Sequence, residues 1–453
     1  MVSRVTLGKL SVETLAEYVE AGAGQGAYSL GIDTSMMKGQ CVSENYRSAL
    51  EAKDGVTKQL KKRCDRGQTL GPYRIEDLKQ LGIADLACNS IGAVSKKDTT
   101  DMRPVDDMHC NRAIKPPKFG MCSLQVLRED ATPGCWWWTV DVEDAFANVP
   151  LGSADRPFML FRWYHTDDTN FEGDSHDYVY LHIKGNFGPR PLPYIYTMIQ
   201  LYVNIAAICV GVTPPPMGYI DDNTATRAVY LDSFESLQLY RAHLRMAGLP
   251  DKPTKEKGPF QHGVILGRFF NSIDMTISMP QDKVRLLESM FLFASAPGSK
   301  MSLGGLESMV GYWEFCLECL PSCLKGFVHN THAWMKGMKR SHTPKHLLRF
   351  VPRKVKRDLQ LMMLVTPMCN GTQPLQPCRG KDWSRPLMTD ACNTGGGYCT
   401  PTMAYARKFT CRERKYIIAL KEALMVREAV EHNAPDWEGT VLPIYYIYWT
   451  PRG

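Results

Sequence analysis

The sequence predicts an α+β protein with more than one domain, and three observations support this. The chain of 453 residues leaves room for two or more domains. Between residues 86 and 280, short β-branched runs alternate with runs of helical periodicity, whereas residues 281–365 are mainly helical in pattern. A Pro-, Gly- and Cys-rich link at 366–382 then separates the last segment, residues 383–453, from the rest.

The N-terminal part is expected to be a lead-in followed by charged helices. Residues 1–40 are dotted with Gly and Ser, and we expect them to be weakly ordered. Residues 41–85 have the pattern of a charged helical segment, which is expected to end at the breaker Gly71-Pro72.

Apolar, β-branched and aromatic runs predict the strands. "WWWTVDV" (136–142) predicts a buried strand that ends on an acid, and "YVYLHI" (178–183) predicts a second strand. "GVILGRFF" and "MTISMP", within 263–280, predict a hairpin with its turn near Asn271-Ser272. In the last segment, "PLMTDAC" predicts a strand and "RKYIIALKEALMVREAVEHN" predicts a helix.

The composition is that of a soluble globular protein in a reducing compartment. Hydrophobic residues make up 44% and charged residues 22%, and the net charge of +7 is compatible with a polyanionic partner. Fifteen cysteines without an apolar leader peptide predict free thiols in a cytoplasmic or nuclear protein that is not secreted. The apolar run 194–212 contains Gln200 and Asn204, so it predicts a buried helix and no membrane partner.

Acids at two predicted strand ends suggest a metal site. Asp141 ends the first strand and Asp144 lies on its continuation, while Asp221 and Asp222 lie side by side in "GYIDDN". A pair of Mg²⁺ ions needs two or three carboxylates from different strands that converge. Asp is also a common turn and cap residue, so the acids alone leave a solvated turn open as the alternative.

Six motifs in a fixed order carry a resemblance to a known family. The chain resembles reverse transcriptases, especially those of retroviruses, LTR retrotransposons and the tyrosine-recombinase (DIRS-type) retrotransposons. The matching segments span about residues 41–335. They are "GAVSKKDTTDMRPVDD" (92–107), "DVEDAFANVPL" (141–151), "FGPRPLPYIY" (187–196), "YIDD" (219–222), "GLPDKPTKEKGP" (248–259) with "VILGRFF" (264–270), and "SLGGLESMVGYWEFCLECLPSC" (302–323).

The resemblance implies a fold and an activity. It implies a right-hand polymerase, with fingers and an antiparallel-sheet palm at 41–280 and a helical thumb and connection at 281–365. It implies an RNA-directed DNA polymerase of a retrotransposon, which extends a primer 3′-hydroxyl with dNTPs on an RNA or DNA template. The implied cofactors are two Mg²⁺ ions, for which Mn²⁺ can substitute.

The resemblance also assigns roles residue by residue. Catalytic and metal-binding roles fall on Asp141, the Val142 carbonyl, Asp221, Asp222 and Lys255. Substrate-binding roles fall on Lys96, Arg103, Phe146, Phe187, Gly188 and Tyr219. Asp141 and Asp221 are the more direct metal ligands, Lys255 protonates the leaving pyrophosphate, and Phe146 is the steric gate against a 2′-hydroxyl.

Each assignment has an ordinary structural alternative. Without the resemblance, the run around Lys96 and Arg103 is a solvated charged loop, and Phe146 is a buried helix aromatic. Gly188 is then a turn glycine, and Tyr219 is a strand aromatic.

The last segment resembles the start of ribonuclease H. "LMTDACNTGGGYC" (387–399) and "RKFTCRERKYIIALKEALMV" (407–426) match its opening strand and first helix, and place two of its four acids at Asp390 and Glu422. The position of the third acid falls in "LPIYYIYWTPRG", which contains no acid. We therefore expect an incomplete ribonuclease H-like domain at 383–453 that does not cleave RNA.

Three other readings remain open at this point. Pro189 and Leu192 depart from the family pattern. The first alternative is therefore a degenerate or domesticated remnant that binds nucleic acid without polymerising. An RNA-dependent RNA polymerase is the second alternative, against which Phe146 argues. The third is a zinc site. Its candidate ligands are Cys319, Cys323, His329 and His332. Buried cysteines on one apolar helix face explain the same spacing.

Overall fold

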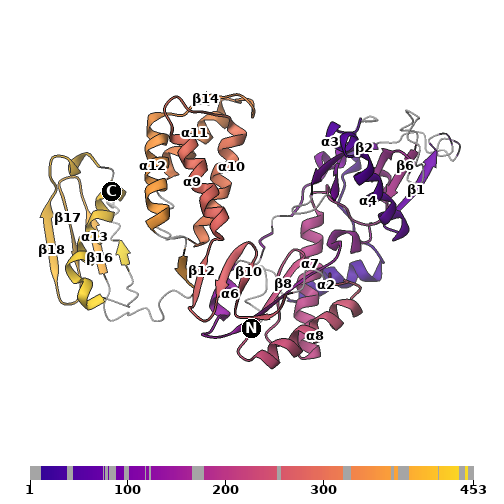
Figure 1. Ribbon diagram of the computed structural model, residues 1–453, viewed down its shortest axis with the longest axis horizontal. Helices are drawn as coiled ribbons and strands as arrows, with labels where there is room; N and C mark the ends of the chain where they lie inside the picture. The colour runs from indigo at the N-terminus through magenta and orange to yellow at the C-terminus, as the bar shows by residue number, and fades with distance from the viewer. Residues whose placement is uncertain are drawn as a thin grey trace. The chain divides into compact units, whose positions relative to one another are not determined.

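The structure is a computed structural model of the 453-residue chain, and it forms two compact units, Met1–Gly267 and Arg268–Gly453 (Figure 1). It describes residues 12–37, 44–74, 76, 80, 88–95, 101–117, 119–121, 124–165, 178–252, 257–319, 328–368, 372–375, 387–416, 418–437 and 444–446. Three residues singled out above, Lys96, Lys255 and Cys323, lie outside this part of the chain.

A four-stranded antiparallel sheet lies at the centre of the first unit. Its strand order is β7-β8-β4-β9. The strands are β4 (Trp136–Asp141), β7 (Met217–Tyr219), β8 (Asp222–Arg227) and β9 (Lys257–Phe260). The predicted buried strand is thus confirmed as β4, and its even-numbered residues Trp138 and Val140 face the core.

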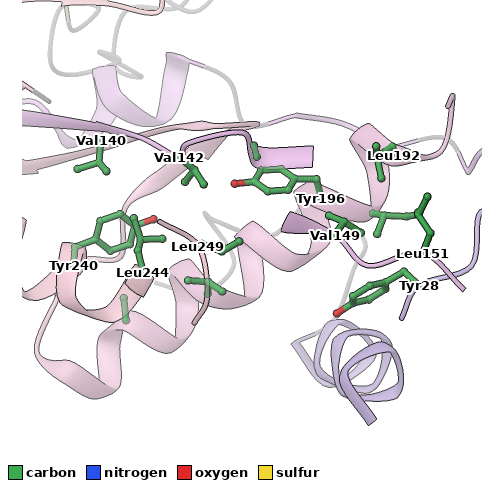
Figure 2. Close-up of a cluster of buried hydrophobic side chains, with 14 of the residues drawn as sticks. Tyr28, Val140, Val142, Val149, Leu151, Leu192, Tyr196, Tyr240, Leu244 and Leu249 are labelled. Carbon is green, nitrogen blue, oxygen red and sulfur yellow. The ribbon is translucent and has the colours of Figure 1, made fainter. Parts of the chain in front are cut away.

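Helices α7 (Leu192–Ala206) and α8 (Tyr230–Met246) pack against one face of this sheet. Figure 2 shows Val140 and Val142 from the strand side together with Tyr196 from α7 and Tyr240 from α8. The opposite face, which carries Asp141, is therefore left available for a site.

The apolar run around α7 is a core helix of the first unit. Residues Leu192–Val210 are long and apolar enough to cross a membrane by length and composition alone, with a mean hydropathy of 1.4, and half of that window is buried. Gln200 and Asn204, the two polar residues that interrupt the run, are fully buried and hydrogen-bonded within the unit. The helix predicted from the sequence is confirmed.

A second sheet in the same unit has the order β1-β6-β5-β2-β3. The strands are β1 (Thr69–Arg74), β2 (Cys88–Ser95), β3 (Met102–Asp107), β5 (Leu160–Trp163) and β6 (Tyr178–His182). Helices α3 (Arg47–Glu51) and α4 (Lys53–Asp65) bury Ala49, Val56 and Leu60 in its core. The breaker Gly71-Pro72 does not end the helical segment as expected: it lies inside β1, where it shifts the pairing register.

The N-terminal segment differs from the expectation of a weakly ordered lead-in. Residues Val12–Gly24 form helix α2, whose Leu15 and Val19 pack on Met198 of α7. Tyr28 continues this contact into the core, where its hydroxyl donates to the Val19 carbonyl at 3.2 Å. Val12, Leu15 and Val19 have the spacing of one helix face, but the Gly and Ser content of residues 1–40 as a whole suggested weak order.

The second unit contains a helical part and a small sheet. Its helices are α9 (Gln281–Ser295), α10 (Leu303–Cys316), α11 (His329–Arg340) and α12 (Arg353–Met368). They pack side by side, with the ribbon of β13 (Lys300–Met301) and β14 (Arg349–Phe350) at one end (Figure 1). Strands β11 (Arg268–Asn271) and β12 (Thr276–Ser278) form the predicted hairpin, but a turn at Leu266-Gly267 divides its predicted first strand into β10 (His262–Ile265) and β11. Strand β12 also pairs with β15 (Thr372–Pro374) of this unit.

The C-terminal sheet has the order β18-β17-β16-β19, with helix α13 (Ile418–Trp437) packed against β16 and β17. Its strands are β16 (Leu387–Ala391), β17 (Gly395–Cys399), β18 (Ala404–Lys408) and β19 (Ile444–Tyr446). The predicted strand and helix of this segment are confirmed as β16 and α13. The remaining elements are α6 (Leu124–Asp130) and 3₁₀ helices at Thr34–Met36, His109–Ala113, Ala145–Asn148, Arg156–Phe158, Ala207–Val210, Leu317–Cys319 and Glu413–Lys415.

Candidate metal and nucleotide site

The register of the central sheet brings together acids that lie 80 residues apart in the sequence. Asp141, the last residue of β4, pairs directly with Asp222, the first residue of β8. Tyr219 of β7 is in turn the cross-strand neighbour of Asp222. Directly opposed residues of antiparallel strands point to the same face, so these three side chains lie on the face that α7 and α8 leave free.

The turn between β7 and β8 presents Asp221 in a strained loop. Ile220 has φ 54°, which is an outlier for a β-branched residue. The Asp221 carbonyl, however, accepts two hydrogen bonds, from Val142 N–H at 3.0 Å and from Asn223 Nδ2 at 3.3 Å. These bonds tie the turn to the end of β4 and hold Asp221 beside Asp141.

A cavity of about 490 Å³ lies over this face of the sheet. Its lining consists of Thr139, Asp141, Asp221, Asp222, Thr224, Lys257, Val264, Ile265, Leu266 and Gly267. The turn at Leu266 and Gly267, with φ 45° and 76°, closes one side of the cavity. Lys257 faces Thr139 across the strands, and its ammonium donates to the Val264 carbonyl at 3.0 Å.

Lys257 is a site residue that the sequence did not single out. It is one of three lysines in "DKPTKEK", and the motif match falls on Lys255 instead. Strand alternation could have identified it, because Lys257 begins β9 and pairs with the residue two before Asp141.

The donor set suits hard divalent cations. Three carboxylates line one cavity, and Val142 adjoins them through its N–H, which donates to the Asp221 carbonyl at 3.0 Å. Within the described part of the chain, no group of three or more His, Cys, Asp or Glu side chains could hold a metal ion by itself. This still fits Mg²⁺, which takes one or two carboxylates and completes its shell with water and substrate phosphates.

Asp144 points away from this group. It has φ 48° and forms an ion pair at 2.6 Å with Arg66, the residue that follows α4, while Arg66 also reaches Glu143 at 3.1 Å. The pair anchors the loop that leads from β4 into the short helix carrying Phe146.

Three of the predicted substrate residues meet one another in the first unit. The Phe146 and Phe187 rings are in edge contact with centroids 5.3 Å apart, and the Arg103 guanidinium lies 4.7 Å over the Phe187 ring. Phe146 also contacts the Tyr196 ring, at 5.8 Å. Both rings are partly exposed, and the guanidinium is exposed. Such a surface can hold a sugar against the rings and a phosphate at the guanidinium.

Gly188 is required by a contact within the protein. Its φ is 156°, and a Cβ at this position would collide with the Asp106 carbonyl of β3. The Phe187 carbonyl accepts from the Asp106 N–H at 2.9 Å, so the two segments are bonded side by side. This contact with β3 accounts for the glycine. The substrate-binding role that the resemblance assigns to Gly188 stays a prediction.

A buried charged cluster supports this segment. Asp106 accepts from Asn186 Nδ2 at 2.5 Å and lies 3.3 Å from His182 Nε2, while Thr69 Oγ1 is 2.9 Å from His182 Nδ1. Burial raises the pKa of Asp106, but His182, Arg63 and Asn186 outweigh this and lower it overall. Burial lowers the pKa of His182 below its ordinary value of 6.5, and Asp106 offsets this only in part.

Acidification is expected to destabilise the first unit through His182. Because the folded pKa lies below the unfolded one, the unfolded chain binds the proton first as the pH falls below about 6.5, and stability falls with it. Urea unfolding followed by tryptophan fluorescence at pH 7.5 and 5.5 measures this. His182→Gln should reduce the drop between the two pH values, whereas the exposed His262→Gln should not; an equal drop in all three proteins would contradict the assignment.

The C-terminal sheet holds Asp390 on β16 and Glu422 on α13. Asp390 is exposed and lines a cavity of about 670 Å³, and its carboxylate accepts from the Ala391 N–H at 2.9 Å. Glu422 lies beside the sheet-facing residues of α13 and is partly exposed. Elsewhere in this region, Arg407 forms ion pairs with both Glu413 and Glu428.

Of the zinc candidates, Cys319 is buried in the second unit and His332 lies 3.7 Å from Glu314. Cys323 is outside the described residues, so the zinc site stays a prediction.

Comparison with known proteins was made for sequence and structure. No protein-family model matches the sequence, and no curated protein does. Three solved structures of the foamy viral protease-reverse transcriptase are similar in fold, at 13–14% sequence identity. The dRH form with double-stranded DNA superposes with a TM-score of 0.58 over 100% of this chain and 74% of that chain.

The chain has a reverse transcriptase-like fold. The complex with an RNA/DNA hybrid gives a TM-score of 0.57 over 99% of this chain and 57% of that chain. The complex with double-stranded DNA gives a TM-score of 0.53 over 98% of this chain and 87% of that chain. In this reverse transcriptase-like fold, the acid cavity and the aromatic pair both lie in the first unit.

Proposed function

We propose that this protein is an RNA-directed DNA polymerase of a retrotransposon, which extends a primer 3′-hydroxyl with dNTPs on an RNA or DNA template. The observation that carries the proposal is the register of the central sheet. It opposes Asp141 to Asp222 and places Asp221 beside them, over a cavity on the open face of a reverse transcriptase-like fold.

The residues of the site have separate roles in this proposal. Asp141 and Asp221 are the principal metal ligands, with Asp222 and the Val142 carbonyl beside them. Two Mg²⁺ ions bound there would lower the pKa of the primer hydroxyl and stabilise the leaving pyrophosphate. Lys255 would protonate the pyrophosphate, and Lys257 adds a cation to the same cavity.

The nucleotide would be held by the neighbouring cluster. Arg103, together with Lys96, would pair with the triphosphate, for which a planar guanidinium and a long ammonium arm are suited. Phe146, held from the side by Phe187, would exclude a 2′-hydroxyl and so select dNTPs. Tyr219 would lie beside the primer terminus.

The division into functional parts follows from this assignment. The first unit would supply fingers and palm, the four-helix part of the second unit the thumb and connection, and the C-terminal sheet a ribonuclease H-like domain. For that domain we propose no cleavage of RNA, because "LPIYYIYWTPRG", where its third acid would fall, contains no acid.

A basic surface of the second unit supports a nucleic-acid partner. Residues 336–357 contain nine Lys or Arg and no acid, and they span the end of α11, β14 and the start of α12. Eight of the nine are exposed. These eight are Lys336, Lys339, Arg340, Lys345, Arg349, Arg353, Lys354 and Arg357. The similar foamy viral structures contain double-stranded DNA or an RNA/DNA hybrid, which is the kind of ligand such a surface fits.

Removing charge from this surface should lower the salt dependence of duplex binding. Each lost phosphate contact reduces the slope of log K against log[salt] by about 0.9. The double variant Arg353→Gln/Lys354→Gln should therefore show a shallower slope than the wild type in fluorescence anisotropy with a labelled duplex. The matched double variant Arg47→Gln/Lys58→Gln removes two exposed cations of α3 and α4 that have carboxylate partners, and it should keep the wild-type slope. Identical slopes for both variants would speak against this surface.

The function itself is tested by primer extension on poly(rA)/oligo(dT) with dTTP. Incorporation by the wild-type chain supports the polymerase. The second candidate, a remnant that binds nucleic acid without polymerising, is motivated by Pro189 and by Leu192, which is buried in the core. Duplex binding without incorporation would favour the remnant.

A further inference from the structure

Five buried polar side chains form a network beneath the acid-bearing turn. They come from α7, β8 and α8, and each has an exposed fraction of 2% or less. The five are Tyr196, Gln200, Asn204, Asn223 and Tyr240. Asn223 bonds the Asp221 carbonyl and Tyr196 contacts the Phe146 ring, but none of the five is among the residues that line the acid cavity. So much buried polarity in an apolar layer is costly unless it is fully paired, so it calls for an explanation.

The network is continuous from α7 to the sheet. The Tyr196 hydroxyl donates to Gln200 Oε1 at 2.8 Å, and Gln200 Nε2 lies 2.8 Å from Asn204 Oδ1 and 2.9 Å from Asn223 Oδ1. Asn204 Nδ2 also reaches Asn223 Oδ1, at 3.1 Å. The strand residue Asn223 is thus held by two amides of one helix.

Tyr240 closes the network from α8. Its hydroxyl donates to Asn204 Oδ1 at 2.5 Å and accepts from Gln200 Nε2 at 3.0 Å. Figure 2 shows Tyr196 and Tyr240 on the helix side of Val140 and Val142. Every polar side-chain atom of the five residues therefore has a partner, which makes the arrangement specific: moving one member leaves another unpaired.

One end of the network reaches the metal site. Asn223 Nδ2 donates to the Asp221 carbonyl, the same atom that accepts from Val142. Gly218 of β7 is packed so closely that a Cβ there would lie 2.8 Å from Asn204 Nδ2. Both strands of the turn are therefore fixed against the network, which offsets the strain at Ile220.

The other end reaches the nucleotide cluster. The Tyr196 ring contacts Phe146, while its hydroxyl bonds Gln200. Burial and the charges of Tyr240, Asp221 and Asp141 raise the pKa of Tyr196 well above its usual value, so the hydroxyl stays a donor at all physiological pH values.

We propose that Tyr196, Gln200, Asn204, Asn223 and Tyr240 are positioning residues that hold Asp221 at its place in the site and couple it to the nucleotide-side aromatic Phe146. This inference rests on the proposed function for the role of Asp221, but the positioning itself is a property of the free chain. The network acts through the Asp221 carbonyl and the Tyr196 ring, and it touches neither metal nor substrate.

Hydrogen exchange of the full chain tests the positioning without any activity. Tyr196→Phe and Tyr240→Phe each delete one hydroxyl and keep the ring, so local protection of the amides in 217–224 should fall by about tenfold, as expected for one buried hydrogen bond. Tyr180→Phe is the matched control, because Tyr180 is equally buried and its hydroxyl donates to the Tyr164 carbonyl at 2.9 Å, away from the turn. An unchanged turn in the two network variants, or a loss of protection spread equally over the unit in all three, would overturn the proposal.

Mn²⁺ titration of the free protein, followed by electron paramagnetic resonance, provides the second measurement. Residues that orient a ligand typically change metal affinity by about 10- to 100-fold. Mn²⁺ affinity should fall in this range for the two network variants and stay at the wild-type value for Tyr180→Phe; equal affinities throughout would overturn the proposal. A wild-type chain that does not extend primers would refute the proposed function, whereas the exchange data decide on the network independently.

Discussion

Asp221→Asn is expected to reduce dNTP incorporation by on the order of 10³-fold, which is the loss seen when one preorganised electrostatic group is removed from an active site. The amide keeps the size of the side chain but removes a negative charge that attracts and holds a divalent cation. The Asp221 backbone, held by Val142 and Asn223, stays in place, so the fold is retained. Single-nucleotide extension under excess dTTP, together with circular dichroism, measures both effects.

Two comparisons make this prediction specific. Asp222→Asn should lose less activity, because Asp221 lies in the turn while Asp222 lies within the ladder opposite Asp141. Asp232→Asn, an exposed acid of α8, should behave as the wild type. If Asp221→Asn were as active as Asp232→Asn, the metal site would be wrongly assigned.

Phe146→Ala is expected to admit rNTPs and to raise the ratio of rNTP to dNTP incorporation by about 10²-fold, the usual scale for discrimination by one hydroxyl. Phe146 is partly exposed and is braced by Phe187 and Tyr196, so its ring has a defined position from which to exclude a 2′-hydroxyl. The measurement is kcat/KM for dTTP and UTP on the same template.

The matched control for the gate is Phe234→Ala, which truncates an exposed phenylalanine of α8. It should leave the ratio unchanged. If Phe146→Ala lost activity with both nucleotides and kept the wild-type ratio, the ring would have a packing role only, and the alternative of a buried helix aromatic would hold.

The elements that carry the acids could be predicted from local sequence. "WWWTVDV" has the composition of a buried strand, and β4 ends at Asp141 as expected. The helix of 194–212 and the strand and helix of the C-terminal segment were predicted for the same reason, because their period or β-branched content is strong. The N-terminal helix α2 was not predicted, because the Gly and Ser content of residues 1–40 as a whole was weighed above the helical spacing of Val12, Leu15 and Val19.

The role of single residues was harder to predict. Gly188 has the backbone conformation that a glycine suggests, yet the neighbour that requires it is Asp106, 82 residues earlier in the chain. Lys257 was passed over in favour of Lys255, because spacing in a motif does not show which lysine of a short run begins a strand. Gln200 and Asn204 were recognised only as interruptions of an apolar run.

The sequence alone determined which residue types are present at the strand ends and in what order the motifs follow each other, because both are written in short stretches of chain. Only the tertiary structure decided which side chains face each other. The register of β4 against β8 pairs Asp141 with Asp222, and the packing of α7 and α8 pairs Gln200 with Asn223 and Tyr240. These partners lie 23 to 81 residues apart, and their pairing depends on long-range burial and register, which no local pattern encodes.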